Sequence, residues 1–203
     1  MTRFSVPVLA TVFLALPLCP SAAADNLQHG RQLAQACAGC HGADGNSANP
    51  KLYPNLAAQA PAYLELQLAN FKSGERPNPA MQAVATSLSP SDMRDLGAYY
   101  GAQVAHPQRA ADRVRENQGR RIFGQGGAGG APACAACHGA DGHGQGRFPR
   151  VASQPAAYAL EQLRVYRAAP SFHNPLAMVM KSVAVKLNED EMRSVAAYMA
   201  TMP

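Results

Sequence analysis

The sequence has no tryptophan, and aromatic residues make up only 6% of its 203 residues. A large part of any hydrophobic core must therefore come from something other than aromatic side chains. Charged residues are also few, at 15%, against 47% hydrophobic residues, which is the composition of a globular chain rather than a disordered one. The length suits two domains of about 90 residues each.

Cysteine is scarce as well, and its placement is informative. Of five cysteines, Cys19 lies near the N-terminus and the other four form two motifs, Cys37-Ala38-Gly39-Cys40-His41 and Cys134-Ala135-Ala136-Cys137-His138. Each motif is followed by Gly-Ala-Asp-Gly. The pattern C-x-x-C-H is the attachment sequence for a c-type haem, because two thiols one helical turn apart can each bond one vinyl group of the same porphyrin. We therefore predict two covalently bound haem c groups, which would also fill the aromatic-poor cores.

This use of cysteine excludes other chemistry. No cysteine outside the N-terminal segment is left for a structural disulfide, a thiol nucleophile or a thiolate ligand to iron. Zinc is the alternative for such Cys/His sets, but the two sets are separated by the length of a domain. Nothing adjacent completes a four-ligand site in either one. The two histidines of the motifs, His41 and His138, are the expected axial ligands of the irons.

The first 24 residues have the features of a secretory signal peptide. Arg3 supplies the positive charge, Val6 to Leu18 the apolar run, and Ala22 to Ala24 a small-residue cleavage site. The run is short and interrupted by proline, which disfavours an uncleaved membrane anchor. Leu18 precedes Cys19 where lipid attachment needs a small residue. We expect cleavage after about Ala24 and location in the periplasm.

Charge is distributed unevenly along a chain of formal net charge +5. Between Asp25 and Ala105 there are five basic and six acidic residues, whereas twelve basic and seven acidic residues follow from His106 onward. Export argues against nucleic-acid binding. The basic half predicts either a solvated surface or a face that docks on an acidic redox partner.

An internal repeat organises the chain after the signal segment. Amphipathic stretches at 27–36 and 110–123 each lead to a haem motif, and helices are expected to start at Pro61 and Pro155. The Gly-rich insert of residues 124–132 is expected to be a flexible loop. We find no alternating strand pattern of useful length, so the prediction is an all-α fold. Its domains would span residues 25–107 and 108–203, with the last helix of the first domain ending near Pro107.

The final helix of each unit has the clearest signals. Ser89 and Asn188 are expected N-caps, with acidic residues three positions later. Behind the caps, apolar or small residues recur at helical spacing and predict a buried stripe in each unit: Met93, Leu96, Gly97 and Tyr100 in the first, and Met192, Val195, Ala196 and Met199 in the second.

A methionine in a proline-containing loop precedes this helix in both units. A thioether opposite a histidine favours ferrous iron and raises the reduction potential. Met81 is the expected sixth ligand in the first unit. In the second, Met178 matches when counted forward from His138, and Met180 matches when counted back from the capped helix; we favour Met180, because the intervening loops differ in length.

The remaining histidines lie in polar stretches without shared placement: His29, His106, His143 and His173. We expect them to be exposed. Only His143 and His173 are considered as alternative iron ligands.

These residues resemble class I cytochromes c, and the tandem arrangement is similar to the dihaem cytochrome c4 family. The resemblance spans the chain after the signal segment and rests on CAGCHGADG and CAACHGADG, PNLAAQAPAYL and PRVASQPAAYA, the two loop methionines, and LSPSDMRDLGAYY and LNEDEMRSVAAYM. It implies two tandem class I cytochrome c domains related by pseudo-twofold symmetry, with haems close enough to exchange electrons. The long Gly-rich insert and the doubled methionine depart from the family pattern.

The family also implies specific contacts. The Pro54 and Pro149 carbonyls would accept the Nδ1–H of the axial histidines. Gly30 with Tyr99, and Gly119 with Tyr198, would form the close contacts between first and last helices.

The function implied is a periplasmic, monomeric carrier of single electrons and not an enzyme. It would be soluble or peripherally associated with a membrane. Its donor and acceptor would be redox proteins, such as a terminal oxidase or a quinol oxidoreductase, with electrons flowing toward the oxidase. The alternatives are a haem subunit of a larger dehydrogenase or oxidase complex, and a dihaem enzyme such as a peroxidase.

Overall fold

The computed structural model describes residues 22–171 and 174–203, so the predicted signal segment lies almost entirely outside the described residues. Within them the regular structure is helical, and the one β-type pairing is an isolated bridge between Gln145 and Phe148. The predicted all-α fold is confirmed. In the part of the chain that is described, no helix is both long and apolar enough to cross a membrane.

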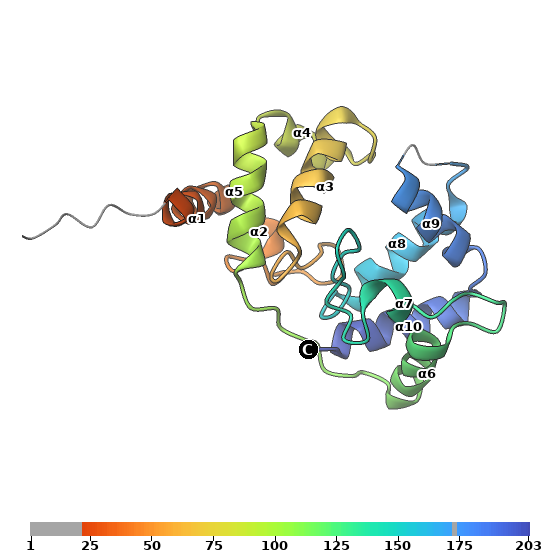
Figure 1. Ribbon diagram of the computed structural model, residues 1–203. Helices are drawn as coiled ribbons and strands as arrows, with labels where there is room; N and C mark the ends of the chain where they lie inside the picture. The colour runs from red at the N-terminus through yellow and green to blue at the C-terminus, as the bar shows by residue number, and fades with distance from the viewer. Residues whose placement is uncertain (1–21, 172–173) are drawn as a thin grey trace, which may run out of the picture.

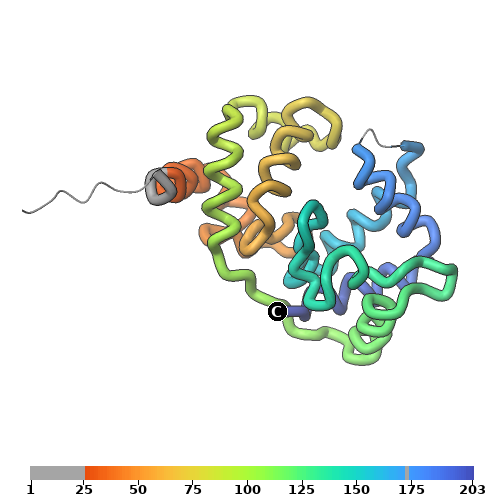
Figure 2. Tube along the Cα trace, viewed as in Figure 1, coloured from red at the N-terminus to blue at the C-terminus, as the bar shows by residue number. Residues whose placement is uncertain are grey.

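The helices form two groups that repeat one order of elements (Figure 1). The first group contains α1 (Ala22–Leu33), the 3₁₀ turn Ala34–Ala36, α2 (Ala38–His41), α3 (Pro61–Ser73), α4 (Pro79–Thr86) and α5 (Pro90–Gly101). The second contains α6 (Arg113–Gln125), α7 (Ala135–His138), α8 (Ala156–Ala168), α9 (Pro175–Ala184) and α10 (Glu189–Thr201). Helix α5 packs on α1 and α3, and α10 packs on α6 and α8. Residues 102–112 connect the groups without helix, as the trace in Figure 2 shows.

The last helix of each group begins as the sequence predicts. Ser89 and Asn188 are N-caps of α5 and α10, and each forms a capping box with the acidic residue three positions later, Asp92 or Glu191. The reciprocal bonds satisfy backbone N–H groups that the first helical turn leaves without partners. The predicted apolar stripes behind both caps are buried.

Four helix boundaries differ from the predictions. Helix α8 starts at Ala156, with Pro155 as its N-cap rather than in its first turn. The stretch 27–36 is split between α1 and the 3₁₀ turn, and α6 starts at Arg113 because the Asp112 side chain caps it by accepting from two backbone N–H groups. Helix α5 ends at Gly101 rather than near Pro107. The Gln103 N–H donates to the Tyr100 carbonyl oxygen at 3.1 Å, a bond spanning three residues rather than four, which tightens the last turn and ends the helix before Pro107.

The Gly-rich insert is held in place, contrary to the expectation of a flexible loop. Helix α6 continues through Gly124, and the Ala128 N–H donates to Glu191 Oε1 at 2.7 Å. A methyl group at Gly129 would come 2.3 Å from the Lys186 carbonyl oxygen. Glycine is therefore needed because the insert packs closely on the segment leading into α10.

First and last helices of each group touch where glycine removes the side chain. A methyl group at Gly30 would lie 2.9 Å from Tyr99 Cβ, and one at Gly119 would lie 2.8 Å from Tyr198 Cβ. Both predicted Gly–Tyr contacts are confirmed. These crossings fix the helix that leads into each C-x-x-C-H motif against the helix that closes the domain.

Candidate haem sites

The first site is built on the one-turn helix α2, which carries Cys40 and His41 directly after Cys37. The His41 ring is buried, at 8% exposure, and its Nδ1 lies 3.0 Å from the Pro54 carbonyl oxygen. Because a carbonyl oxygen can only accept, Nδ1 carries the proton. In the neutral imidazole the lone pair is therefore on Nε2, and the contact selects this one tautomer.

The second site repeats this arrangement on α7. His138 is 6% exposed, and its Nδ1 donates to the Pro149 carbonyl oxygen at 2.8 Å. The contacts expected of Pro54 and Pro149 are thus present in both domains. A bond of this kind holds the ring in position and makes its other nitrogen more basic as a ligand.

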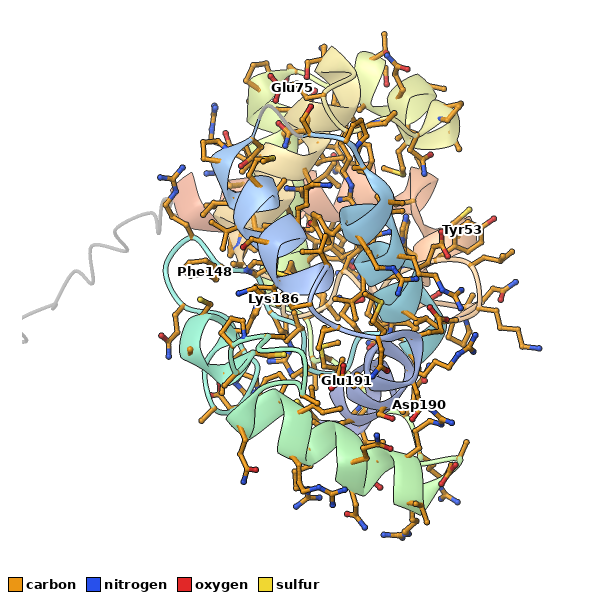
Figure 3. All side chains as sticks on the ribbon, turned by 90° about the vertical axis from the view of Figure 1, so that its right-hand side faces the viewer. Tyr53, Glu75, Phe148, Lys186, Asp190 and Glu191 are labelled. Atoms are coloured by element: carbon orange, nitrogen blue, oxygen red, sulfur yellow. The ribbon has the colours of Figure 1, made fainter. Side chains whose placement is uncertain are left out.

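An aromatic ring packs near each of these histidines. Tyr53 and His41 have ring centroids 6.0 Å apart, and Phe148 and His138 have centroids 6.2 Å apart. Tyr53 directly precedes Pro54, and Phe148 directly precedes Pro149. Figure 3 labels the two rings toward opposite sides of the view. Sequence reasoning missed them, although their shared place before the proline was a signal.

Burial sets the protonation of the site residues. It lowers the pKa of both His41 and His138, with the proline contacts opposing part of the effect, so the rings are neutral and able to bind a metal. Burial raises the pKa of the Cys37 thiol and raises that of Cys134 to about 11. Both thiols are therefore uncharged at neutral pH.

The arrangement of the cysteines and histidines fits haem attachment rather than a zinc site. All four motif cysteines are free rather than paired in disulfides. Among residues 22–171 and 174–203, no three His, Cys, Asp or Glu side chains converge on a point that could hold a metal ion. Two thiols and one oriented imidazole in each domain fit a covalent haem and do not fit a closed zinc site.

The candidate methionine ligands lie on short helices, and their predicted placement in loops is wrong. Asn78 caps α4 by accepting the Met81 N–H at 3.0 Å, and Pro79 occupies the first helical position. Asn174 and Pro175 start α9 in the same way. Asparagine followed by proline is a favourable helix start, which outweighs the reading of proline as a loop residue.

Packing distinguishes the two candidates on α9. Met180 is half-buried against the core of the second domain, and it lies four residues before Ala184, which has no exposed surface. Met81 likewise precedes the fully buried Ala85 by four residues. Met178 is 40% exposed. The register of the inner helix face thus equates Met180 with Met81.

The other histidines have different roles. His29 is exposed and its Nδ1 lies 2.7 Å from Asp95 Oδ2. His143 is exposed as well and contacts Asp141 and the Pro203 carbonyl oxygen. His106 is also exposed. His173, the remaining alternative ligand, lies outside the described residues.

Four buried polar residues join the two domains, and sequence reasoning missed them. The Gln59 side chain bonds the backbone N–H and carbonyl of Arg150, both at 2.9 Å. The Gln154 side chain bonds the backbone N–H and carbonyl of Asn55 at 3.2 and 2.8 Å. Each glutamine is the sixth residue of a repeat that starts at Pro54 or Pro149, and this shared position was the available signal. The reciprocal pairing is what a pseudo-twofold interface requires.

Comparison with known proteins places these features in a class. The Cytochrome c family model matches residues 27–100 and again residues 117–203. The chain therefore contains two cytochrome c domains in tandem and carries two covalently bound haem c groups.

Individual relatives narrow the class. The chain is 34% identical over 201 residues to cytochrome c4 of Pseudomonas aeruginosa, a match covering 94% of this chain and 96% of the relative. It superimposes on the crystal structure of reduced recombinant cytochrome c4 from Pseudomonas stutzeri with a TM-score of 0.81 and 31% identity, covering 87% and 98% of the two chains. It is also 36% identical over 173 residues to a thiosulfate dehydrogenase electron acceptor of Stutzerimonas stutzeri, covering 83% and 80%. The chain belongs to the cytochrome c4 family of dihaem electron-transfer proteins.

Proposed function

We propose that this protein is a periplasmic carrier of single electrons rather than an enzyme. Thioether bonds from Cys37 and Cys40 would hold one haem, with His41 and Met81 as its axial ligands. Cys134 and Cys137 would hold the other, with His138 and Met180. The observation that carries the proposal is the duplicated, buried neutral imidazole whose Nδ1–H is fixed by a proline carbonyl. Bound in this way, haem supplies one-electron chemistry between ferric and ferrous iron.

The chain's own contribution is to hold the ligands still in both oxidation states. The buried rings are fixed by the proline carbonyls, and the two methionines are fixed on capped helices. Burial of the histidines keeps water from their ring nitrogens. A site that moves little between oxidation states suits electron transfer, whereas a peroxidase needs an iron with a vacant or displaceable ligand.

The choice of Met180 over Met178 is supported by burial and by helix register. Met180 contacts the core of its domain, and its spacing to Ala184 repeats the spacing of Met81 to Ala85. The domain limits proposed are residues 25–107 and 108–203. This division is supported by the separate packing of α5 with α1 and α3, and of α10 with α6 and α8.

Direction of flow and location form the finer part of the proposal. The signal-like first 24 residues and the haem-attachment motifs support export to the periplasm. We propose a respiratory donor such as a quinol oxidoreductase, a terminal oxidase as acceptor, and a monomer free to diffuse between them. The basic second half, including the arginines of α6, would favour an acidic docking face on a partner.

A second candidate role is acceptance of electrons from a thiosulfate-oxidising dehydrogenase. The similarity to a relative that is named for this role favours it. The same two haem sites would serve, and only the electron donor would differ. The chain would then be a partner of the dehydrogenase, either free or as a subunit of its complex.

An optical and redox titration of the exported protein tests the proposal. The expected result is two haems per chain, both low-spin, each with the weak ferric methionine–iron charge-transfer band. Fewer than two haems, or a high-spin fraction that reacts with peroxide, would contradict it. Stopped-flow mixing of the reduced protein with a terminal oxidase, and of the oxidised protein with a thiosulfate dehydrogenase and thiosulfate, separates the two roles.

A further inference from the structure

Two buried glutamines reach across the domain interface to the same point of the opposite domain. Gln154 bonds the backbone of Asn55, and Gln59 bonds the backbone of Arg150. All four residues are less than 9% exposed. A peptide N–H can only donate, so each glutamine Oε1 must face the N–H and each Nε2 must face the carbonyl.

The N–H groups that donate to the two glutamines belong to the same peptide units that hold the axial histidines. The Pro54 carbonyl, which accepts from His41 Nδ1, and the Asn55 N–H, which donates to Gln154 Oε1, are the two ends of one peptide group. The Pro149 carbonyl and the Arg150 N–H are related in the same way, between His138 and Gln59. In each domain an unbroken chain of hydrogen bonds therefore runs from the imidazole through one peptide to a side chain of the other domain.

The backbone beside each glutamine is strained in the same way. Ala58 and Ser153, which directly precede Gln59 and Gln154, have φ angles of +56° and +60°. Their N–H groups are tied to the carbonyls of Tyr100 and Met199 in the closing helix of their own domain. Left-handed backbone at non-glycine residues persists only where surrounding contacts impose it. The same strain at both equivalent positions turns each glutamine toward the interface.

We infer that Gln154 and Gln59 are positioning residues that set the reduction potential of the haem in the opposite domain. The inference rests on the proposed ligation by His41 and His138. Hydrogen bonds in series polarise one another, and the effect is larger in a buried environment. An acceptor on the Asn55 N–H makes the Pro54 carbonyl oxygen more negative, which strengthens its bond to His41 Nδ1–H and makes the ring a more basic ligand.

The sign of the effect follows from the ligand. A more basic imidazole stabilises ferric iron more than ferrous iron, so each glutamine lowers the potential of the haem it serves. Removing Gln154 should raise the potential of the first-domain haem, and removing Gln59 should raise that of the second-domain haem. Each domain is thus tuned by its neighbour.

The test compares Gln154→Leu with Gln59→Leu in the full-length dihaem protein. Each removes one glutamine and two bonds across the interface, so each is the matched control for the other. Tyr158→Phe is a third variant: it removes a bond from Arg76 Nη2 across the same interface (2.9 Å) without touching either peptide. A Met81→His background identifies the redox step of the first-domain haem, because only that step should fall.

The expected result is a crossed pattern. The first-domain step rises in Gln154→Leu and the second-domain step rises in Gln59→Leu, while Tyr158→Phe moves neither. In ¹⁵N-histidine spectra of the reduced protein, the Nδ1–H signal of His41 moves upfield in Gln154→Leu only. The isosteric Gln154→Met and Gln59→Met variants repeat the comparison if leucine prevents folding.

Equal movement of both steps in both leucine variants, or no movement beyond that of Tyr158→Phe, would overturn the inference and leave the glutamines as docking residues. Failure of the proposed ligation has a different signature: Met81→His would then displace no redox step, or the unmodified chain would carry fewer than two haems.

Discussion

The α-carbon of Gly119 on α6 lies against the backbone of Ser194 on α10, where a methyl group would come 2.0 Å from the Ser194 carbonyl oxygen. Backbone cannot move aside as a flexible side chain can. We therefore expect Gly119→Ala to destabilise the second domain by about 1–3 kcal/mol, the usual cost of overpacking. Urea unfolding followed by the circular dichroism of the helices measures it.

Gly124 lies on the same helix and provides the control. A methyl group there meets nothing within 4 Å. Gly124→Ala should leave stability unchanged or raise it by up to ~1 kcal/mol through helix propensity. Equal losses in the two variants would show that the helix crossing is not responsible.

Replacing Met180 should remove the ferric methionine–iron charge-transfer band of the second haem and lower its potential. A thioether ligand favours the ferrous state, and alanine leaves the iron without one. Met178→Ala should leave the band and both potentials in place, because Met178 lies on the more exposed side of α9. Optical spectra at stepwise poised potentials check both variants, and loss of the band in Met178→Ala alone would reverse the assignment.

Glu191 should contribute more to stability than Asp92, although both occupy the third position of a capped helix. Both carboxylates accept the N–H of their N-cap residue, but Glu191 also accepts the Ala128 N–H from the Gly-rich insert. We expect Asp92→Ala to cost about 1 kcal/mol, as for loss of a cap, and Glu191→Ala to cost about 1.5–3 kcal/mol more. Amide hydrogen exchange at Ala128 should accelerate only in Glu191→Ala.

The acidic limb of the stability curve should depend on Glu189. A bond from Arg164 lowers its pKa from 4.5 to about 2, and the nearby Arg167 and Arg193 add to the effect. The carboxylate therefore stabilises the fold at pH values above 4.5, and the contribution fades as pH falls toward 2.

Glu189→Gln should lower the melting temperature slightly at pH 7, where the exposed cluster is screened by solvent. The difference from the unmodified protein should narrow below pH 4.5 and vanish near pH 2. Glu161→Gln is the matched control, because Glu161 makes only a 3.7 Å contact with the same Arg164. Thermal unfolding across this pH range checks both variants, and a difference that persists at pH 2 would contradict the assignment.

The repeat and the capped helices were predictable because their signals are local. Ser89 with Asp92, and Asn188 with Glu191, are recognisable within four residues, and C-x-x-C-H fixes its own neighbourhood. The proline contacts of both histidines followed from the family resemblance, and the structure contains both. The ends of helices were less predictable, because the end of α5 depends on how the Gln103 N–H bonds back to Tyr100 in the last turn.

The interface was not predictable from local pattern. Gln59 and Gln154 are polar residues in irregular segments, and nothing near them in sequence indicates that their partners lie 91 and 99 residues away. The packing of the Gly-rich insert was missed for a related reason. Its glycines suggested conformational flexibility, whereas Gly129 lacks a side chain so that the Lys186 backbone can pack against it.

Gln59 and Gln154 bond main-chain atoms of the opposite domain. These bonds therefore do not depend on which side chain the bonded residue carries. Asparagine stands at position 55 and arginine at the equivalent position 150, yet both are held by the same pair of bonds. After a gene duplication, the two domains can therefore diverge in surface charge and in redox partner while the symmetric hydrogen bonds of their interface are retained.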